Sequence, residues 1–139
     1  MGVEISIDYQ GSLHCVAKHS LSGQSIITDA PLDNGGKGEA FSPTDLVGAA
    51  LGTCIITVMD LVARRSGIDL VGTKVHVIKE MTSIPIRRIG KLTVTLIYPK
   101  GLNLSEADRK KLGKAAHTCP VKQSLHQDVE VEVNFNYPG

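Results

Sequence analysis

Apolar and polar residues alternate in several short segments toward both ends of the chain. In the segment 3–9, every second residue is apolar, namely Val3, Ile5, Ile7 and Tyr9. A period of two is typical of a strand that turns one face toward a core. Two further strand-like segments, 13–19 and 24–30, follow after the short turns QGS and SLSG. We therefore expect residues 1–32 to form an N-terminal meander of three strands.

The C-terminal part, residues 69–139, combines strand patterns with two short helices. Strands are expected at 69–82, 87–99 and 128–136, and the last of these, DVEVEVNFN, alternates strictly. Ser105 can cap a helix, SEADRKKLGKAAH, in which acidic residues come first and basic residues later, as the helix dipole favours. A further short helix begins at Pro120. The order β-β-β-α-β-β-α-α-β indicates a single α+β domain over residues 1–139.

The segment 43–66 carries the clearest helix signals. Ser42 is a suitable N-cap, Pro43 fits the first helical position, and Asp45 completes a capping box. Arg64 and Arg65 fall in the last turn, before a glycine that can end the helix. The uncharged stretch 46–59 has only fourteen residues, whereas a membrane-spanning helix needs about 20 apolar residues. We therefore expect a buried core helix.

The middle of this helix is apolar on every face. One stripe at three- and four-residue steps is predicted to face the core; it contains Val47, Leu51, Cys54, Val58 and Leu61. A domain of 139 residues has few residues with which to surround so long a helix. A dimer in which two such helices bury each other would cover the remaining faces.

The composition narrows the class of protein. The formal net charge of +1 gives no reason to expect a nucleic acid or an anionic membrane as partner. The N-terminus lacks the basic start and apolar run of a signal peptide, so a cytoplasmic location is expected. The three cysteines, Cys15, Cys54 and Cys119, do not form the even set typical of a secreted disulfide framework.

Two of these cysteines are candidates for chemistry. Cys119 precedes Pro120, so its sulfur would lie beside the unpaired N–H groups at a helix start, where the pKa of a thiol is lowered. The alternative is that Cys119 is a small buried side chain without a reactive role. Cys54 lies within the apolar stripe of the central helix and, taken singly, is best explained as part of the core. Cys15 is expected to fill space within a strand.

The segments SPTDLVGAALGTC and HTCPVKQSL together resemble the two signature segments of the OsmC/Ohr family of thiol-dependent peroxidases. In that family, a proline–acid–leucine sequence opens a long helix rich in alanine and glycine that leads to a cysteine. A second cysteine follows some sixty-odd residues later in a Cys-Pro helix start; here Cys54 and Cys119 are 65 residues apart. The predicted order of elements also matches the family over nearly the whole chain.

The resemblance implies an OsmC-like fold, an intertwined homodimer and an antioxidant role in the response to oxidative stress. Cys54 would be the peroxidatic cysteine, attacking an organic hydroperoxide or hydrogen peroxide and becoming a sulfenic acid. Cys119 would resolve it in a Cys54–Cys119 disulfide, which a dithiol reductant would reopen. No cofactor and no metal are expected.

The sequence departs from the family pattern in the groups that activate the thiol. Members that reduce organic hydroperoxides use an arginine from the N-terminal strands and a glutamate near the start of the central helix. This chain has no arginine before Arg64, and Thr44 occupies the glutamate position. Asp45, one residue later, lies about half a turn away from the Cys54 face. The remaining candidates are the cations His14, Lys18 and His19, the loop carboxylate Glu39, and Arg87 or Arg88 from a partner subunit.

Two alternatives therefore remain open. The fold could serve as a non-catalytic dimer that binds a small apolar ligand, or its thiols could sense redox state without turnover. A zinc site formed by His117 and Cys119 with Cys15 or His126 would have suitable ligands, but no CxxC or HxxxH spacing supports it.

Overall fold

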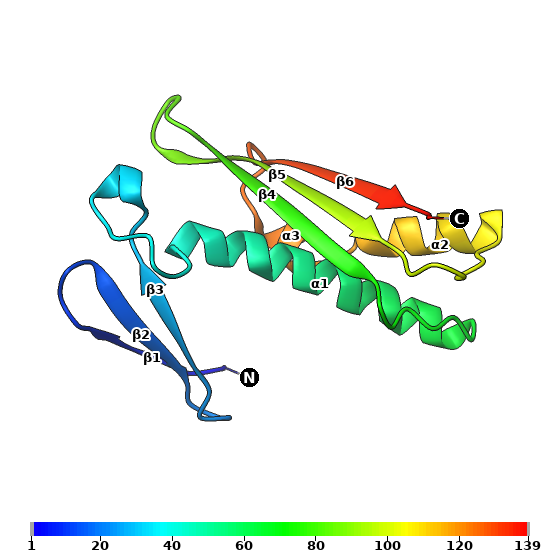
Figure 1. The fold of residues 1–139 in the computed structure, drawn as a ribbon, viewed down its shortest axis with the longest axis horizontal. Helices are drawn as coiled ribbons and strands as arrows, with labels where there is room; N and C mark the ends of the chain where they lie inside the picture. Colours follow the sequence, from blue (N-terminus) through cyan, green and yellow to red (C-terminus); the bar gives the residue numbers. More distant parts are fainter. Residues whose placement is uncertain (1, 139) are drawn as a thin grey trace. The chain divides into compact units, whose positions relative to one another are not determined.

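The computed structural model describes residues 2–138 and divides into two compact units, Met1–Val47 and Gly48–Gly139. We call them the N-terminal unit and the C-terminal unit and describe each by itself (Figure 1). The expectation of one domain over residues 1–139 stays a prediction. The chain is of the α+β class, with two three-stranded sheets and helices.

The N-terminal unit contains the expected meander. Its strands are β1 (Ile5–Tyr9), β2 (His14–His19) and β3 (Ser25–Asp29), paired antiparallel in the order β1-β2-β3. A short 3₁₀ turn, η1 (Leu32–Asn34), follows β3 and was not expected from the sequence. Gly36 lies so close to the carbonyl group of Ala30 that a Cβ atom there would overlap it, which explains a glycine in this connection.

Helix α1 (Pro43–Arg65) begins in the N-terminal unit with the predicted capping box. The N–H of Asp45 donates to Ser42 Oγ at 3.1 Å, and the N–H of Ser42 donates to Asp45 Oδ2 at 2.9 Å. Two N–H groups that the helix leaves unpaired are thereby satisfied. Arg64 and Arg65 fall in the last turn, as predicted.

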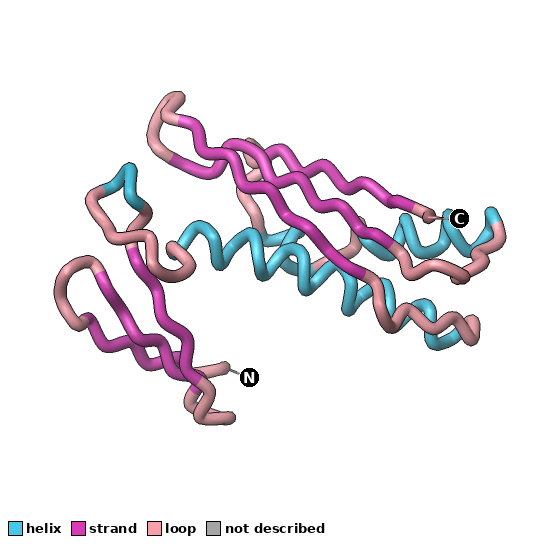
Figure 2. Tube along the Cα trace, in the orientation of Figure 1, coloured by secondary structure: helices cyan, strands magenta, loops and turns pink. Residues whose placement is uncertain are grey.

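The C-terminal unit is built on strands β4 (Lys74–Thr82), β5 (Arg88–Ile97) and β6 (Glu130–Asn136), in the order β4-β5-β6. β4 pairs antiparallel with β5, whereas β5 pairs parallel with β6. Parallel neighbours need a crossover connection, and helices α2 (Glu106–Ala116) and α3 (Pro120–Ser124) lie within it. In Figure 2 the helices of this unit run along one side of the sheet.

All nine regular strands and helices that the sequence predicts are present, in the predicted order. The largest error in their bounds is at β4, which begins at Lys74 rather than near residue 69. Leu70 is buried, but the segment before Lys74 forms turns. Leu70 therefore belongs to a loop and packs onto the core, whereas Val71 beside it is 84% exposed, and strand periodicity does not distinguish such a loop from a strand.

The core of the C-terminal unit lies between α1 and the sheet. The fully buried side chains from α1 and β5 are Leu51, Ile55, Met59, Ala63, Leu92, Val94 and Leu96. Two glycines of α1 allow the helix to approach the sheet closely, since Gly52 faces Val75 and Val77, and Gly48 faces Val77 and Leu92. By length and hydropathy alone α1 would qualify as a membrane span; 33% of that stretch is buried, and its glycine side packs against the sheet.

The prediction of which side of α1 faces the core was wrong. Leu51 is fully buried, but Cys54 and Val58 are only partly buried and Leu61 is 59% exposed. When a helix is apolar on every face, hydrophobicity does not favour one side over another. The side with small residues then packs against the sheet, because it allows the closest approach. Here the glycine side, with Gly48 and Gly52, packs inward.

Candidate active site

Cys119 is the N-cap of α3, as its position before Pro120 predicted. Pro120 occupies the first turn, and the backbone N–H of Lys122 is directed at Cys119 Sγ, with N and S 3.5 Å apart. The side chain is completely buried, whereas Pro120 and the two residues before Cys119 are exposed. The sulfur therefore lies directly beneath an exposed turn of the chain.

Cys54 lies in the middle of α1 and is partly buried. Its side chain lies near that of Cys119 and acts on the protonation of the Cys119 thiol, raising the pKa of that thiol. The fold thus places next to each other two thiols that are 65 residues apart in sequence. Both belong to the C-terminal unit, so their contact depends on the packing of α1 and α3 within one compact body. Both are free cysteines in this structure.

The environment raises the pKa of Cys119, contrary to the expectation from its capping position. Burial is the largest cause, followed by the interaction with the neighbouring Cys54 side chain. The backbone N–H groups of Lys122 and Val121 act in the predicted direction and lower the pKa, but their effect is smaller. Cys119 therefore retains its proton at neutral pH. The sequence showed the cap but not the burial, which comes from packing around α3.

A lysine and a histidine lie beside Cys119. Lys122 Nζ is 3.0 Å from His117 Nδ1, and Gln123 donates its side-chain N–H to the carbonyl of His117. Burial and the neighbouring charge of Lys122 lower the pKa of His117, so its ring is neutral at neutral pH and can accept from the ammonium group. The sequence alone does not indicate this pair, because a contact between residues five positions apart arises only from the turn between α2 and α3.

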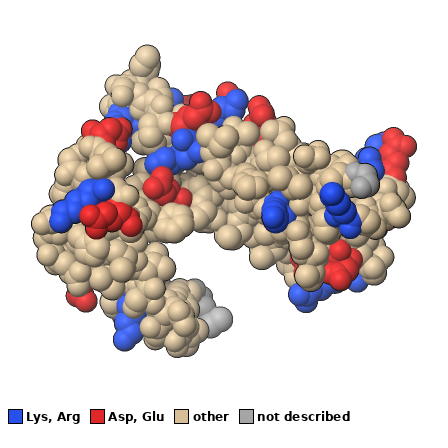
Figure 3. Space-filling model, viewed as in Figure 1, with Lys and Arg blue, Asp and Glu red and all other residues tan. Residues whose placement is uncertain are grey.

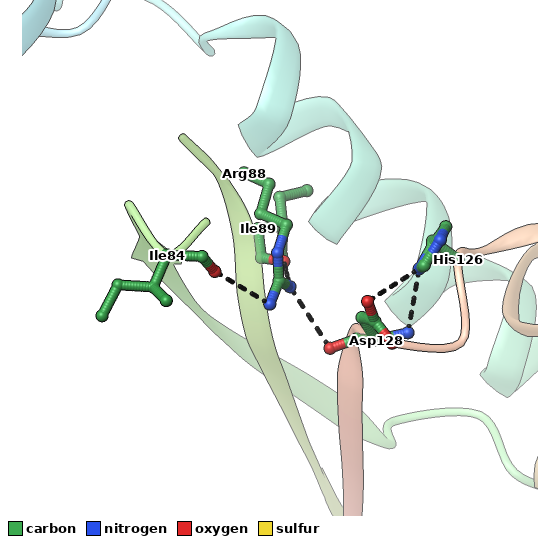
Figure 4. A network of polar contacts seen from close by, with 5 residues as sticks. All are labelled: Ile84, Arg88, Ile89, His126 and Asp128. Carbon is green, nitrogen blue, oxygen red and sulfur yellow. Dashed lines mark hydrogen bonds and ion pairs between the residues drawn. The ribbon is translucent and has the colours of Figure 1, made fainter. Parts of the chain in front are cut away.

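Arg88, one of the proposed thiol-activating arginines, binds carbonyl groups of its own chain (Figure 4). Its terminal nitrogens donate to the carbonyls of Ile84, Ile89 and Asp128 at 3.1–3.3 Å. Arg88 therefore joins the β4–β5 connection to the loop that precedes β6. Within this loop, the N–H of Asp128 donates to His126 Nδ1 at 3.0 Å.

The candidate cations of the first strands, His14, Lys18 and His19, lie in the N-terminal unit. His14 Nδ1 lies 2.6 Å from Asp29 Oδ1, and the other carboxylate oxygen of Asp29 accepts the N–H of Glu39 at 3.2 Å. His19 Nδ1 is engaged with Ser22 Oγ at 2.6 Å, and Lys18 is exposed. His14 is thus the one of the three that a buried carboxylate holds in place.

The two carboxylates that could replace the usual glutamate, Asp45 and Glu39, differ in their surroundings. Asp45 accepts the N–H of Ser42 as the capping residue described above, and Thr44 Oγ1 lies 3.2 Å from Ser42 Oγ. Glu39 is exposed in the loop before α1. The third cysteine, Cys15, is partly buried in β2, between Tyr9 and Thr28 of the neighbouring strands.

Among residues 2–138, no three His, Cys, Asp or Glu side chains are grouped so that they could hold a metal ion. The zinc alternative, which needed His117 and Cys119 together with Cys15 or His126, finds no such cluster in that range.

With this geometry established, the sequence can be compared with known proteins. The profile of the OsmC-like protein family matches residues 36–134, which include both cysteines of the pair. The chain belongs to the OsmC-like protein family. No curated protein matches the sequence.

Solved structures agree with this assignment. A Psychrobacter arcticus 273-4 protein, whose name refers to osmotic stress induction and detoxification response, is 39% identical, with 98% of each chain covered and a TM-score of 0.90. An organic hydroperoxide resistance protein OsmC from Legionella pneumophila is 16% identical, with 98% of this chain and 97% of that chain covered and a TM-score of 0.78. An OsmC-like protein from Mycoplasma pneumoniae is 14% identical, with coverages of 100% and 99% and a TM-score of 0.80. The last two show the fold alone.

Proposed function

We propose that this protein is a thiol-dependent peroxidase that reduces organic hydroperoxides, and hydrogen peroxide as a smaller substrate. The observation that carries the proposal is the proximity of the Cys54 and Cys119 side chains inside one compact unit. Membership in the OsmC-like family and the likeness in fold to an organic hydroperoxide resistance protein support it.

The reaction begins at Cys54, the more exposed of the two thiols. Its thiolate attacks one oxygen of the hydroperoxide, the O–O bond breaks, and the departing alkoxide takes a proton and leaves as an alcohol. Cys54 is then a sulfenic acid. The sulfur of Cys119 attacks the sulfur of the sulfenic acid, a disulfide forms, and the hydroxyl group leaves with the Cys119 proton as water. A dithiol reductant restores both thiols by transferring two electrons and two protons.

The raised pKa of Cys119 suits the second of these roles. A thiol that keeps its proton at neutral pH is protected from direct oxidation, because the thiolate is the reactive form. Its contact with Cys54 still permits attack once the sulfenic acid has formed. The cycle is expected in the cytoplasm, where thiol reductants are present.

We propose further that the active protein is a homodimer. The chain exposes many large apolar side chains, more than a stable monomer needs to leave in solvent. In the N-terminal unit, one face of the meander carries Ile5, Ile7, Tyr9 and Ile26, which are 49–65% exposed. In the C-terminal unit, Leu61 of α1 is 59% exposed. Uncharged side chains cover most of the face drawn in Figure 3.

The cycle is tested by intact mass and free-thiol count after one equivalent of cumene hydroperoxide. The wild type should lose about 2 Da and two thiols as the disulfide forms. Cys119→Ser should stop at a trapped sulfenic acid, and Cys54→Ser should not react. Cys15→Ser is the matched control and should behave as the wild type. Three unreacted thiols in the wild type would refute the peroxidase proposal.

A second candidate function is the binding of a small apolar ligand by a dimer without turnover. A depression of about 390 Å³ in the C-terminal unit supports it; it is lined by Ile56, Thr57, Asp60, Leu61, Arg64, Leu70 and Val71. The absence of an arginine before Arg64 and the engagement of Arg88 with backbone carbonyls also weaken the case for strong thiol activation. Unreactive thiols together with saturable binding of a fluorescent fatty acid would favour this function.

A further inference from the structure

The sulfur of Cys119 also stabilises the start of helix α3. The backbone N–H of Lys122 is directed at Cys119 Sγ, with N and S 3.5 Å apart, and Pro120 has no N–H to contribute. The first N–H groups of a helix find no partner within the helix, so this sulfur is the side-chain acceptor at the start of α3. The reactive atom of Cys119 is therefore also the cap of a helix.

Helix α3 is short and has few other contacts that hold it. It has five residues, Pro120–Ser124, and none of them is fully buried. Two contacts close the turn before it: Lys122 Nζ lies 3.0 Å from His117 Nδ1, and the side-chain N–H of Gln123 donates to the His117 carbonyl at 3.2 Å. Both contacts need Lys122 and Gln123 in their helical positions, so they depend on the cap.

Cys54, in contrast, lies on a helix that the core holds in place. Its neighbours Leu51 and Ile55 are 0% exposed, and the glycine side of α1 packs against the sheet. A covalent bond brings two sulfurs much closer than a contact between two free thiols, so at least one sulfur must move when the disulfide forms. The movement costs least where few buried contacts oppose it, which is at Cys119 and α3.

From this arrangement we infer that the start of α3 is a redox-sensitive switch: the Cys54–Cys119 disulfide draws the Cys119 sulfur toward α1, away from the Lys122 N–H, and releases residues 120–124 from the helix. The inference rests on the disulfide of the cycle proposed above and not on turnover. The two thiols give up two electrons and two protons to the oxidant. In the proposed cycle the oxidant is the hydroperoxide, which leaves as an alcohol and water.

The switch changes the surface of the molecule although the sulfur that drives it is buried. His117, Pro120, Gln123 and Ser124 are exposed while α3 is formed. When α3 is released, the Lys122 ammonium group separates from the His117 ring, so the oxidation state of the thiols becomes visible from outside. The helix and the disulfide compete for one sulfur. The helix therefore favours the dithiol form, and loosening it favours the disulfide by the same factor.

Limited digestion with trypsin tests whether α3 is formed, because cleavage after Lys122 requires the chain to open locally. Diamide forms the Cys54–Cys119 disulfide without a hydroperoxide. All proteins carry Cys15→Ser, so that no other disulfide can form within the chain. The digest is then reduced, and mass spectrometry measures the fragment that ends at Lys122. Cleavage after Lys110, which is exposed on α2, is the reference within the same sample.

Cleavage after Lys122 should be roughly fivefold or more faster in the disulfide form, which is the size expected for the loss of an N-cap, and cleavage after Lys110 should not change. Cys54→Ser is the matched control. It keeps the Cys119 cap but cannot form the disulfide, so diamide should leave its cleavage after Lys122 unchanged. Cys119→Ser should also be insensitive to diamide, with α3 at least as protected, because serine is a strong N-cap.

The equilibrium with a dithiothreitol redox buffer gives a second measurement. Pro120→Gly weakens the start of α3 in the dithiol form, because proline at the first helical position is already set for the helix and glycine is not. The ratio of disulfide to dithiol at a fixed buffer composition should therefore rise several-fold in this variant.

Other outcomes overturn the inference. Equal cleavage after Lys122 in the two forms, or an unchanged ratio in Pro120→Gly, excludes a switch at α3. Faster cleavage after both Lys110 and Lys122 would show that the disulfide loosens more of the unit than α3, which excludes a local switch as well. If diamide forms the disulfide but cumene hydroperoxide does not, the peroxidase proposal fails while the result on the switch stands. If neither oxidant forms the disulfide, both fail.

Discussion

Replacing Gly52 by alanine tests how closely α1 packs on the sheet beneath the thiol pair. A Cβ atom at position 52 would lie 2.7 Å from Cγ2 of Val77 and 3.4 Å from Cγ1 of Val75. The first distance is too short for two carbon atoms, and a valine side chain is stiff about χ1 and cannot swing aside. Gly48→Ala is the matched control, because a Cβ there meets Val77 and Leu92 at 3.5 and 3.7 Å, which is ordinary contact.

Two effects on the free energy of unfolding are expected; one applies to both substitutions and the other applies only to Gly52→Ala. Alanine gains about 0.8–1.0 kcal/mol over glycine in a helix interior, and this gain applies at both positions. Inserting a methyl group into a filled core costs about 1–3 kcal/mol, and this cost falls on position 52 alone. We therefore expect Gly48→Ala to raise the free energy of unfolding by up to about 1 kcal/mol. Gly52→Ala should change it by between about 0 and −2 kcal/mol, which leaves a difference of about 1–3 kcal/mol between the variants.

Urea denaturation followed by circular dichroism measures both variants under one set of conditions. The difference should appear as a shift in midpoint at unchanged slope, which identifies a change in stability instead of a change in the unfolded state. Because Gly52 lies two residues before Cys54, the disulfide yield with diamide should also fall in Gly52→Ala and not in Gly48→Ala. If Gly52→Ala is as stable as Gly48→Ala, the inference that glycines set the helix-to-sheet distance is wrong.

Three further predictions follow from single contacts. Ser42→Ala removes the acceptor of the Asp45 N–H and should lower the free energy of unfolding by about 1 kcal/mol in urea titration. Arg88→Met removes the donors to the Ile84 and Asp128 carbonyls, and amide hydrogen exchange should rise in both loops without a change in α1. The raised pKa of Cys119 means that the unfolded thiol loses its proton at a lower pH than the folded one. Stability should therefore fall as pH rises above about 8.5, and Cys119→Ala should fall less steeply than the wild type in a pH series of urea titrations.

The fold was largely predictable because its signals are local. Strand alternation, the Ser42–Asp45 capping box and the Ser105 cap each depend on residues only a few positions apart, and all are present. The parallel pairing of β5 with β6 and the inward side of α1 were not predicted from the sequence. Both depend on contacts between distant segments, and in α1 the apolar residues on every side gave no preferred direction.

The place of Cys119 at a helix start was predictable from the sequence, whereas its electrostatics were not, and the catalytic roles of Cys54 and Cys119 stay predictions. The Cys-Pro pattern correctly placed Cys119 at the cap of α3, and the resemblance to the OsmC/Ohr family predicted that Cys54 would be its partner. The predicted lowering of the Cys119 pKa was wrong because the sequence reveals the nearby N–H groups but not the burial that outweighs them. The Lys122–His117 contact was missed for a similar reason, since it forms across the turn that separates α2 from α3.

The raised pKa of Cys119 has a chemical consequence for the proposed pair. A thiol that keeps its proton is a poor nucleophile, because the thiolate is the reactive form of cysteine. Burial keeps the proton on Cys119, the fully buried partner, which leaves the partly exposed Cys54 as the sulfur that a hydroperoxide can reach. The same burial prevents an external reductant from reaching Cys119 directly. Reduction should therefore begin at Cys54 Sγ, with a mixed disulfide at Cys54 and a free thiol at Cys119, and mass spectrometry of acid-quenched reductant mixtures can identify which cysteine carries the reductant.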